Sequence, residues 1–563
     1  AASAGESLAA GVIFTIPALI LMDHWSDFSF TEHYWTVTGI AALGGLLGVL
    51  FTIPLRRALI VEEQLQFPEG IATAEVLKSG ERGTKGLKLL IHAALLGGVF
   101  KFAAEGLRLW EGILSSARAV GRTYASFQIN LSPALISVGY IVGINIATLV
   151  FAGGVIGRWI CLPILAFSHE IPPDELANGA NAAVNYLHNH YVKYIGVGAM
   201  IVGGLWALIN LRKSLGRGIQ SGMEVYRDMR KPGSKAVART DMDTPLPWVM
   251  IALLVSLVPI FAIYLTVVQS VAISSLMAVL MLVAGFVFSA VAAYMAGLVG
   301  SSNNPISGVT IATILLTALL LYVLKVYGGA DVGPAAAIFI GAVVCCAAAI
   351  GGDNMQDLKA GYIVGATPWK QQIMQAIGTL SAALVMMPVL WLLHNRYGIG
   401  QQVNPEVTPL EAPQASLMAN IARGVFDQDL PWNLIFIGCL IAVVIIALDK
   451  YLEATKSGFR TPVLAVAVGL YLPFHLAVPI FLGGLISYIT SGVTSLHSEK
   501  TNQSGLLFAS GLITGEALIG IFLALPLMIK EFTPWKSIPT EFNIVETPPF
   551  EAWPGVVLLA MVV

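Results

Sequence analysis

The sequence predicts an all-α, polytopic membrane protein of about 14–15 transmembrane helices, arranged as two parallel repeats with broken or re-entrant helices. Composition is the first of three observations behind this fold class, because 56% of the 563 residues are hydrophobic, only 11% are charged and the mean hydropathy is +0.78. A soluble protein of this length needs more charged surface, and a disordered chain is less hydrophobic, so both classes are excluded. The formal net charge of −2 offers no basic field, so we expect no nucleic-acid partner and place the chain in a lipid bilayer.

Long apolar runs are the second observation, since about 20 helical residues cross a hydrocarbon core of about 30 Å. The clear runs are residues 35–55, 87–107, 131–156, 192–211, 248–268, 271–299, 306–327, 333–352, 372–393, 432–448, 462–488 and 505–529, with a shorter one at 155–167. Two more, at 7–22 and 556–563, meet the ends of the chain, so we expect part of a span to be missing at each end.

The loops between these runs give an orientation. Residues 212–239 carry eight lysines and arginines, which places this loop in the cytoplasm, whereas residues 23–33 and 169–190 carry none and are expected outside. The partly polar stretch from 107 to 131 fits either a surface helix or another span. The four cysteines lie in apolar runs without the spacing of a metal or disulfide framework, so we interpret them as packing residues and expect no metal site.

An internal repeat is the third observation. The segment GYIVGINIATLVFAGG (139–154) aligns without gaps on GLYLPFHLAVPIFLGG (469–484), with five of sixteen residues identical. Ser132-Pro133 and Thr461-Pro462 precede the two copies, and each pair is typical of an N-cap followed by proline in the first helical turn. A looser similarity joins SAGESLAAGVIFTIP at the start to ITGEALIGIFLALP near the end. We therefore expect a first repeat over residues 1–240 and a second over 241–563, with substrate near the bilayer midplane between them.

Polar residues that interrupt the apolar runs are the candidate site residues, because a charge in hydrocarbon is costly unless it is paired or hydrated. In GSSNNPISG (300–308), Asn304 can cap a helix that starts at Pro305, and the exposed amides would suit a carboxylate. This pattern predicts substrate contacts at Asn303, Asn304 and Ser307, and an ordinary capped loop is the alternative.

Two further polar segments occupy corresponding places in the two halves. In GGDNMQDLKAGYIVGATPWKQQ (351–372), Asp353, Gln356 and Asp357 share one helical face, and Thr367-Pro368 opens the next helix. The glycine and threonine content favours a re-entrant passage along a cavity, with Gln356 and Asp357 contacting substrate, whereas a cytoplasmic loop is the alternative. Segment 62–80 has a similar mixture, with a short interfacial helix as its alternative.

The second copy of the repeat contains Pro473 and Pro479 inside a spanning run, and these must interrupt its hydrogen-bond ladder. Broken helices are tolerated in a membrane where they line a cavity, which makes Tyr471 and His475 candidate substrate residues, with Asn145 as the repeat partner of His475. A histidine satisfied within the core is the alternative.

Three acidic residues in apolar surroundings are candidates for proton coupling: Glu6, Glu516 and Asp353. Burial disfavours the charged form of a carboxyl group and lets it exchange a proton near neutral pH. A structural ion pair is the alternative for Glu6 and Glu516.

Five strings in order along the chain carry a family resemblance: QFPEGIATAEVL, SSNNPISG, QDLKAGYIVGATPWKQQ, GLYLPFHLAVPIFLGGL and ASGLITGEALIGI. Together they resemble the oligopeptide transporter family, which includes the yellow stripe-like metal-chelate carriers. The resemblance implies a duplicated fold of about sixteen transmembrane helices, a further hydrophobic segment before residue 1, and proton-coupled uptake of small peptides, peptide derivatives or metal chelates. The sequence is more similar to prokaryotic members, which implies a bacterial inner membrane, and members of the family can form homo-oligomers.

The resulting hypothesis is a symporter that imports small oligopeptides or peptide-like compounds by alternating access, uses the proton gradient and needs no cofactor. Uptake of metal chelates is the alternative substrate class. A channel would not need duplicated caps together with broken helices. An enzyme would need a nucleophile with a base, or a metal motif such as H-E-x-x-H, and the sequence contains neither.

Overall fold

The computed structural model describes residues 3–25, 28–79, 84–206, 209, 238–301, 304, 306–328, 333–399, 412–457, 459–493, 498–532 and 551–562. The chain divides into two compact units. The first contains Ala1–Leu65, Met200–Gly297 and Ser301–Cys439, and the second contains Gln66–Ala199, Leu298–Gly300 and Leu440–Val563. Each unit takes segments from both sequence halves, so the repeat boundaries at residue 240 do not coincide with the units and stay a prediction.

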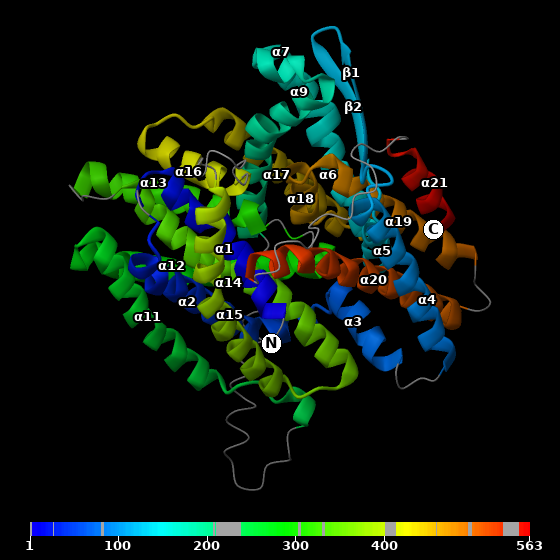
Figure 1. The fold of residues 1–563 in the computed structure, drawn as a ribbon, viewed down its shortest axis with the longest axis horizontal. Helices are drawn as coiled ribbons and strands as arrows, with labels where there is room; N and C mark the ends of the chain where they lie inside the picture. The colour runs from blue at the N-terminus through cyan, green and yellow to red at the C-terminus, as the bar shows by residue number, and fades with distance from the viewer. Residues whose placement is uncertain are drawn as a thin grey trace. The chain divides into compact units, whose positions relative to one another are not determined.

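The first unit is built around α14 (Pro334–Val364), a helix whose most apolar 18-residue stretch is entirely buried. The helix begins with Pro334 in its first turn and ends where Gly365 adopts a left-handed φ of 72°. The other elements of this unit are α1 (Ser3–Leu21), α2 (Phe30–Arg56), π-helical η1 (Arg57–Glu62), 3₁₀-helical η5 (Arg239–Asp241), α11 (Leu246–Val268), α12 (Val271–Val299), α13 (Ile306–Gly328), α15 (Pro368–Tyr397) and α16 (Pro413–Phe426). Figure 1 shows α14 among these helices, and α1, α2, α13 and α16 pack directly against it.

Small residues let α1 and α2 approach the backbone of α14. A Cβ on Gly11 of α1 would lie 2.8 Å from Cα of Cys346, and a Cβ on Gly44 of α2 would lie 2.6 Å from the Val343 carbonyl oxygen. Cys346 is fully buried at this contact and Cys345 is fully buried against Thr310 of α13, which agrees with their interpretation as packing residues. Close backbone approach of this kind stabilises helix pairs in membranes by van der Waals contact, because lipid supplies no hydrophobic drive.

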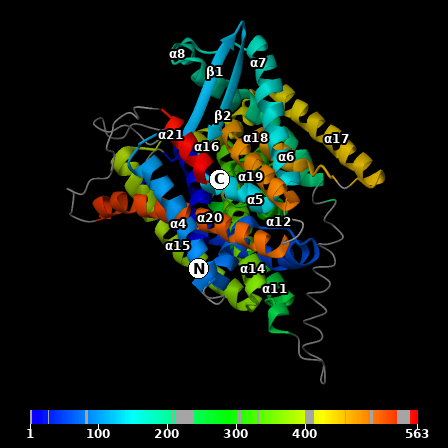
Figure 2. The same ribbon diagram turned by 90° about the vertical axis from the view of Figure 1, so that its right-hand side faces the viewer.

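The second unit contains α3 (Pro68–Ser79), α4 (Thr84–Lys101), η2 (Phe102–Gly106), β1 (Ile113–Val120), β2 (Thr123–Asn130), α5 (Pro133–Val142), α6 (Ile144–Val155), η3 (Ile156–Cys161), α7 (Leu162–Ser168), α8 (Pro173–Ala177), α9 (Ala180–Leu187), η4 (His188–Val192), α18 (Val463–Tyr471), α19 (Phe474–Val493), α20 (Ser498–Phe532) and α21 (Trp553–Val562). Residues 193–199 are also helical, and α17 (Trp432–Ala454) leads from the first unit into this one. α4 packs along α20, as Figure 2 shows.

Residues 113–130 form a β-hairpin, where the sequence suggested a surface helix or another span; that prediction was wrong. β1 and β2 pair antiparallel from Ile113↔Asn130 to Val120↔Thr123, around a two-residue turn in which Gly121 has φ 64°. In a strand pair, hydrogen bonds between the strands satisfy the backbone, so apolar residues need no helical spacing. An interpretation based on helical runs therefore missed the alternation of polar and apolar residues in this stretch. The hairpin packs against α7 and α9 (Figures 1 and 2).

The two copies of the repeat break at the same aligned position. The first copy is divided into α5 and α6 at Gly143, which has φ 88°, and the second into α18 and α19 at Leu472-Pro473. Gly143 aligns on Pro473 at the offset of 330 residues that relates the two copies. Pro479 lies inside α19 without ending it. The predicted interruption is therefore confirmed at Pro473 and wrong at Pro479.

The packing of these four half-helices has an approximate two-fold symmetry. A Cβ on Gly139 would clash with the Ile480 carbonyl, and its counterpart Gly469 meets the Val150 carbonyl, which is the repeat mate of Ile480. The rings of Phe151 and its own counterpart Phe481 stack on one another, with centroids 4.6 Å apart. A residue pairs with its own mate only at a symmetry axis, so the local axis passes between these two rings.

Nine helices among the described residues are long and apolar enough to cross a membrane, and shorter apolar helices occur at Ser7–Leu21, Pro133–Val142, Phe474–Thr490 and Ser504–Gly520. The chain is therefore a polytopic, almost entirely helical membrane protein. Segment 62–80 includes the short helix α3, which is the form its alternative interpretation predicted. The loop at 212–237 lies outside the described residues.

Candidate functional site

Most of the predicted polar segment 351–372 continues α14 as regular helix up to Val364, so the prediction of a re-entrant passage here was wrong. Backbone hydrogen bonds along the helix are satisfied within it, and Leu358 and Ala360, which lie on nearly opposite sides of α14, are both buried. Pro368 starts α15 as predicted, but the Thr367 side chain makes no cap hydrogen bond.

The polar side chains at this end of α14 contact three neighbouring helices. The Ser7 hydroxyl of α1 donates to Asp353, and Nε2 of Gln356 donates to the Ala296 carbonyl of α12 at 3.0 Å. From α15, Nε2 of Gln375 lies 3.2 Å from the Asn354 carbonyl and 3.4 Å from Oδ2 of Asp357. The structure thus brings together Asp353, Gln356 and Asp357 as the sequence predicted, on a continuous helix.

Asn304 joins the same region from the start of α13. Its Nδ2 donates to the Ala292 carbonyl of α12 at 3.1 Å and lies over Gly352, where a Cβ would meet it at 2.7 Å. Its Oδ1 is buried without a hydrogen-bond partner, so Asn304 does not cap α13 and that prediction was wrong. Ser307 is buried in the first turn of α13, whereas Asn303 lies outside the described residues.

We define the polar core of α14 as the buried side chains with unsatisfied polar atoms in contact with this helix: Ser289, Asn304, Asn354 and Gln375. The atoms without a hydrogen-bond partner are Oγ of Ser289, Oδ1 of Asn304, both Nδ2 and Oδ1 of Asn354, and Oε1 of Gln375. Each unsatisfied buried group costs about 1–3 kcal/mol. Such a concentration in one place needs partners from water or from a bound polar molecule, which is typical of a solvated path.

The second unit holds the other predicted substrate residues. Tyr471 ends α18 and is buried, with its backbone under Gly196, where a Cβ would lie 2.8 Å from Cα of Tyr471. His475 is half-buried in the first turn of α19, and its repeat partner Asn145 is exposed in the first turn of α6. The break thus places Tyr471 and His475 on either side of the Leu472-Pro473 interruption.

A buried arginine that the sequence analysis missed lies beside His475. Arg158 of η3 is 3% exposed, and its Nε and Nη2 atoms have no hydrogen-bond partner. Its charge acts on both His475 and His188, and His188 is itself buried with an unpartnered Nε2. The signal in the sequence was a single arginine, IGRWIC, inside an apolar run.

Glu516 of α20 binds the start of α5. Ser132 caps α5 by accepting a hydrogen bond from the Leu135 amide, as predicted, and its hydroxyl donates to Glu516 at 2.8 Å. The Ala134 amide donates to the same carboxylate at 2.9 Å, and Nζ of Lys101 lies 3.9 Å away. The side chain of Glu6 lies outside the described residues.

The corresponding start of α18 is held differently from the prediction. The helix begins at Val463 with Pro462 as its N-cap, and the Thr461 hydroxyl is buried without a partner, so the expected threonine cap was wrong. Instead Asp449 accepts a hydrogen bond from the Thr461 amide at 2.8 Å and pairs with Arg460 at 2.8 Å. A carboxylate from another helix therefore positions the first half-helix of each copy.

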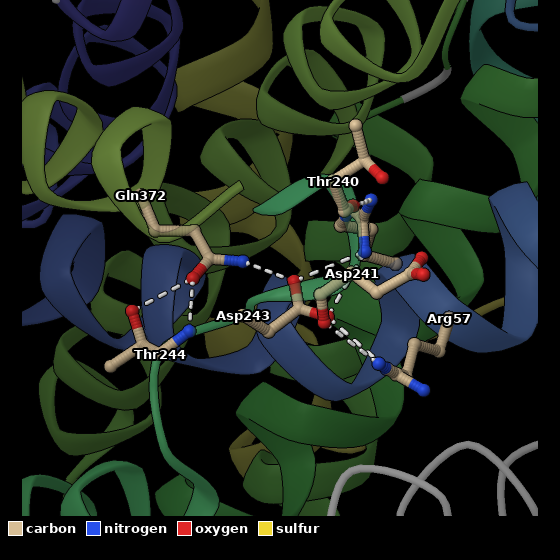
Figure 3. A network of polar contacts seen from close by, with 7 residues as sticks. Arg57, Thr240, Asp241, Asp243, Thr244 and Gln372 are labelled. Atoms are coloured by element: carbon tan, nitrogen blue, oxygen red, sulfur yellow. Dashed lines mark hydrogen bonds and ion pairs between the residues drawn. The ribbon is translucent and has the colours of Figure 1, made fainter. Parts of the chain in front are cut away.

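A further network in the first unit, shown in Figure 3, ties the end of α2 to the start of α15. Asp243 accepts hydrogen bonds from Nη1 of Arg56 at 3.0 Å, Nε of Arg57 at 3.2 Å and Nε2 of Gln372 at 2.9 Å. Oε1 of Gln372 in turn accepts from the amide and hydroxyl of Thr244. The Asp243 carboxylate and the Gln372 amide are bound by protein groups, which indicates an anchor for the segment, while Nε of Arg56 is left without a partner.

A bundle of long apolar helices with interrupted half-helices and buried polar clusters is typical of polytopic membrane transporters. The family model described as OPT oligopeptide transporter protein matches residues 1–527. The chain belongs to the OPT oligopeptide transporter family.

Two relatives illustrate the range of the family. A Haemophilus influenzae protein named "Putative oligopeptide transporter" is 35% identical over 589 residues, which covers 99% of this chain and 90% of the relative. A protein of Arabidopsis thaliana named metal-nicotianamine transporter YSL2 is 24% identical over 518 residues, covering 86% of this chain and 74% of the relative. The resemblance to this family, including its yellow stripe-like branch, is thereby confirmed.

Proposed function

We propose that this protein is a proton-coupled symporter of the bacterial inner membrane that imports small oligopeptides or peptide-like compounds by alternating access. The polar core of α14 is the observation that carries the proposal. Unsatisfied amide and hydroxyl groups around a largely buried helix match the donors and acceptors of a peptide backbone, and Asn304 supplies one acceptor. Gln356 and Asp357 flank this core on the same helix.

Uptake of metal chelates is the second candidate, and the similarity to the metal-nicotianamine transporters favours it. A chelate carries several carboxylates, so its recognition would depend more on cationic groups than on the neutral amides of the polar core. Competition separates the two substrate classes. An excess of an iron–nicotianamine complex should leave uptake of labelled trialanine unchanged if peptides are the cargo.

Uptake of labelled trialanine into proteoliposomes tests the assigned residues. Asn304→Ala and Tyr471→Ala are each expected to lower uptake about tenfold at low substrate concentration, because a lost hydrogen bond to substrate is worth about 1–1.5 kcal/mol. Thr317→Val is the matched control, since the Thr317 hydroxyl is buried but bonds only to carbonyls of its own helix. Uptake by both alanine variants equal to that of the control would remove these residues from the substrate path.

A further inference from the structure

Arg158 is the one buried arginine of the second unit whose guanidinium atoms are recorded without partners among the described residues. It lies in an apolar stretch, Ile144–Ser168, that is long enough to span a membrane. A guanidinium there is costly unless an anion, a carbonyl or water compensates its charge. The surroundings of Arg158 therefore decide what it can bind.

None of the elements packed most closely against η3 supplies an acid. These are α6, α7, α18, η4 and β2, and their sequences contain no aspartate or glutamate. The ionisable groups around this cluster are instead basic: Arg158, Lys193 and His475 act on His188 through their charges, and Arg158 also acts on His475. Arg158 thus has basic side chains nearby and no acid on the described elements that pack most closely against η3.

The geometry of the broken helix adds to this charge. His475 lies in the first turn of α19, directly after the interruption at Leu472-Pro473, so the free amides and positive dipole end of α19 begin beside it. The imidazole of His188 is bound to the backbone of Tyr471, the last residue of α18, while its Nε2 has no partner. Both half-helices of the second copy therefore contribute to the surroundings of Arg158.

We propose that Arg158, His188 and His475 form a carboxylate-binding site, here named the Arg158 cluster. A guanidinium presents paired N–H groups that match the two oxygens of a carboxylate, and the imidazole of His475 and the free amides at the start of α19 can donate to the same oxygens, while His188 lines the site. The proposal rests on the proposed function, because it assigns the bound group to the carboxylate of a transported peptide. A chelator carboxylate is the other source of the same chemistry.

The symmetry-related position, formed by the repeat mates of Arg158 and His475, lacks this chemistry. At the gapless offset of 330 residues, Tyr488 stands in place of Arg158 and Asn145 in place of His475. Tyr488 is 65% exposed. The local two-fold symmetry of the half-helices is therefore not matched by the charges, and a single carboxylate site is expected per chain.

Thermal unfolding of the purified full-length chain in detergent tests the site. Trialanine is expected to raise the Tm of the wild type, whereas trialaninamide, in which an amide replaces the carboxylate, is expected to leave it unchanged. Arg158→Met should abolish the rise and should not lower the Tm without ligand, because it removes an uncompensated buried charge. Tyr488→Phe is the matched control and should keep the full rise.

Each alternative result has a defined meaning. A rise in the wild-type Tm with trialaninamide or sodium chloride equal to that with trialanine would overturn the carboxylate site. An equal rise of the Arg158→Met variant with trialanine would overturn it too. A rise with citrate but not with trialanine would support the site and assign it to a chelator. If Arg158→Met does not yield folded protein, Arg158→Lys replaces it in the test. Lysine keeps the charge but loses the paired N–H groups, so this variant should bind trialanine at least about tenfold more weakly than the wild type. An unchanged dependence of Tm on trialanine concentration would overturn the proposal.

Transport separates failure of the site from failure of the function. Wild-type protein that shows the carboxylate-dependent rise but takes up no trialanine in proteoliposomes would retain the site and reject peptide import. Unchanged uptake of trialanine by Arg158→Met, with the same KM as the wild type, would retain peptide import and reject the site.

Discussion

Asp243 shows how a single carboxylate can hold several segments of this protein. It accepts hydrogen bonds from two adjacent arginines at the end of α2, and Arg56 is only 2% exposed. The same carboxylate binds Gln372 in the first turns of α15. Arg56 and Arg57 thus depend on one acid for their charge compensation in this network (Figure 3).

Replacing that acid should be strongly destabilising. Asp243→Asn leaves Arg56 buried without its counter-charge, and we expect a loss of about 3 kcal/mol in the free energy of unfolding. The measurement is denaturant unfolding in detergent. Asp241→Asn is the control, because Asp241 is exposed and its recorded contact to Arg57 uses the backbone carbonyl. Similar losses in the two variants would contradict this role of the Asp243 carboxylate.

Glu516 has two possible roles that one substitution distinguishes. If it couples protons, Glu516→Gln should flatten the pH dependence of trialanine uptake, since glutamine cannot exchange a proton. If it only anchors α5 through Ser132 and the Ala134 amide, the variant should lose about 1–2 kcal/mol of stability and keep the wild-type pH profile. The pH profile of initial uptake rates therefore decides, and an unaltered profile would reject the coupling role.

At the level of elements, the glycines of the repeat explain why the half-helices pack so closely. Gly153 faces the Val466 carbonyl, and its counterpart Gly483 faces the Ile136 carbonyl, which is the repeat mate of Val466. A side chain at either position would have to displace backbone. The identical residues that reveal the repeat in the sequence are thus, in part, the residues that make the symmetric contact.

Alanine substitutions test this symmetry. Gly153→Ala and Gly483→Ala are each expected to destabilise the protein by about 1–3 kcal/mol and by similar amounts, because they force apart two symmetry-related pairs of half-helices, α6 from α18 and α19 from α5. Gly520→Ala in α20 is the control, since a Cβ there meets nothing within 4 Å. Tm values of the three variants provide the comparison. A clearly unequal effect of the first two would show that the two contacts are not energetically equivalent.

The elements also show what sequence reasoning could reach. Pro473 breaks its helix because it lacks an amide hydrogen, and that effect is local and predictable. Gly143 breaks the first copy without proline, through a φ of 88° that glycine adopts without strain. Pro479 and the hairpin at 113–130 were mispredicted because neighbouring elements, and not the local pattern, decide whether a proline is tolerated or a polar stretch becomes a strand pair.

At the level of the whole molecule, the fold class followed from composition and apolar length, while the clusters depended on distant contacts. Asp353, Gln356 and Asp357 were found from helical spacing because they share one face of α14. Arg158 was missed because a lone arginine in an apolar run has many explanations. Its importance emerges only when η4 and α19 bring His188 and His475 to its side and the elements packed most closely against η3 bring no acid.

Coupling to the proton gradient is a property of the whole transport cycle, so it is tested on the intact protein. In proteoliposomes with an alkaline interior, a symporter that carries one proton per peptide should accumulate labelled trialanine about tenfold for each pH unit of gradient, because one unit corresponds to about 1.4 kcal/mol. A channel would only equalise the concentrations, since it provides no coupling between the two fluxes. Adding a protonophore should release the accumulated peptide down to the external concentration. Accumulation that persists without a gradient, or uptake that stops at equal concentrations with one, would reject proton-coupled symport while leaving the membership of the family unaffected.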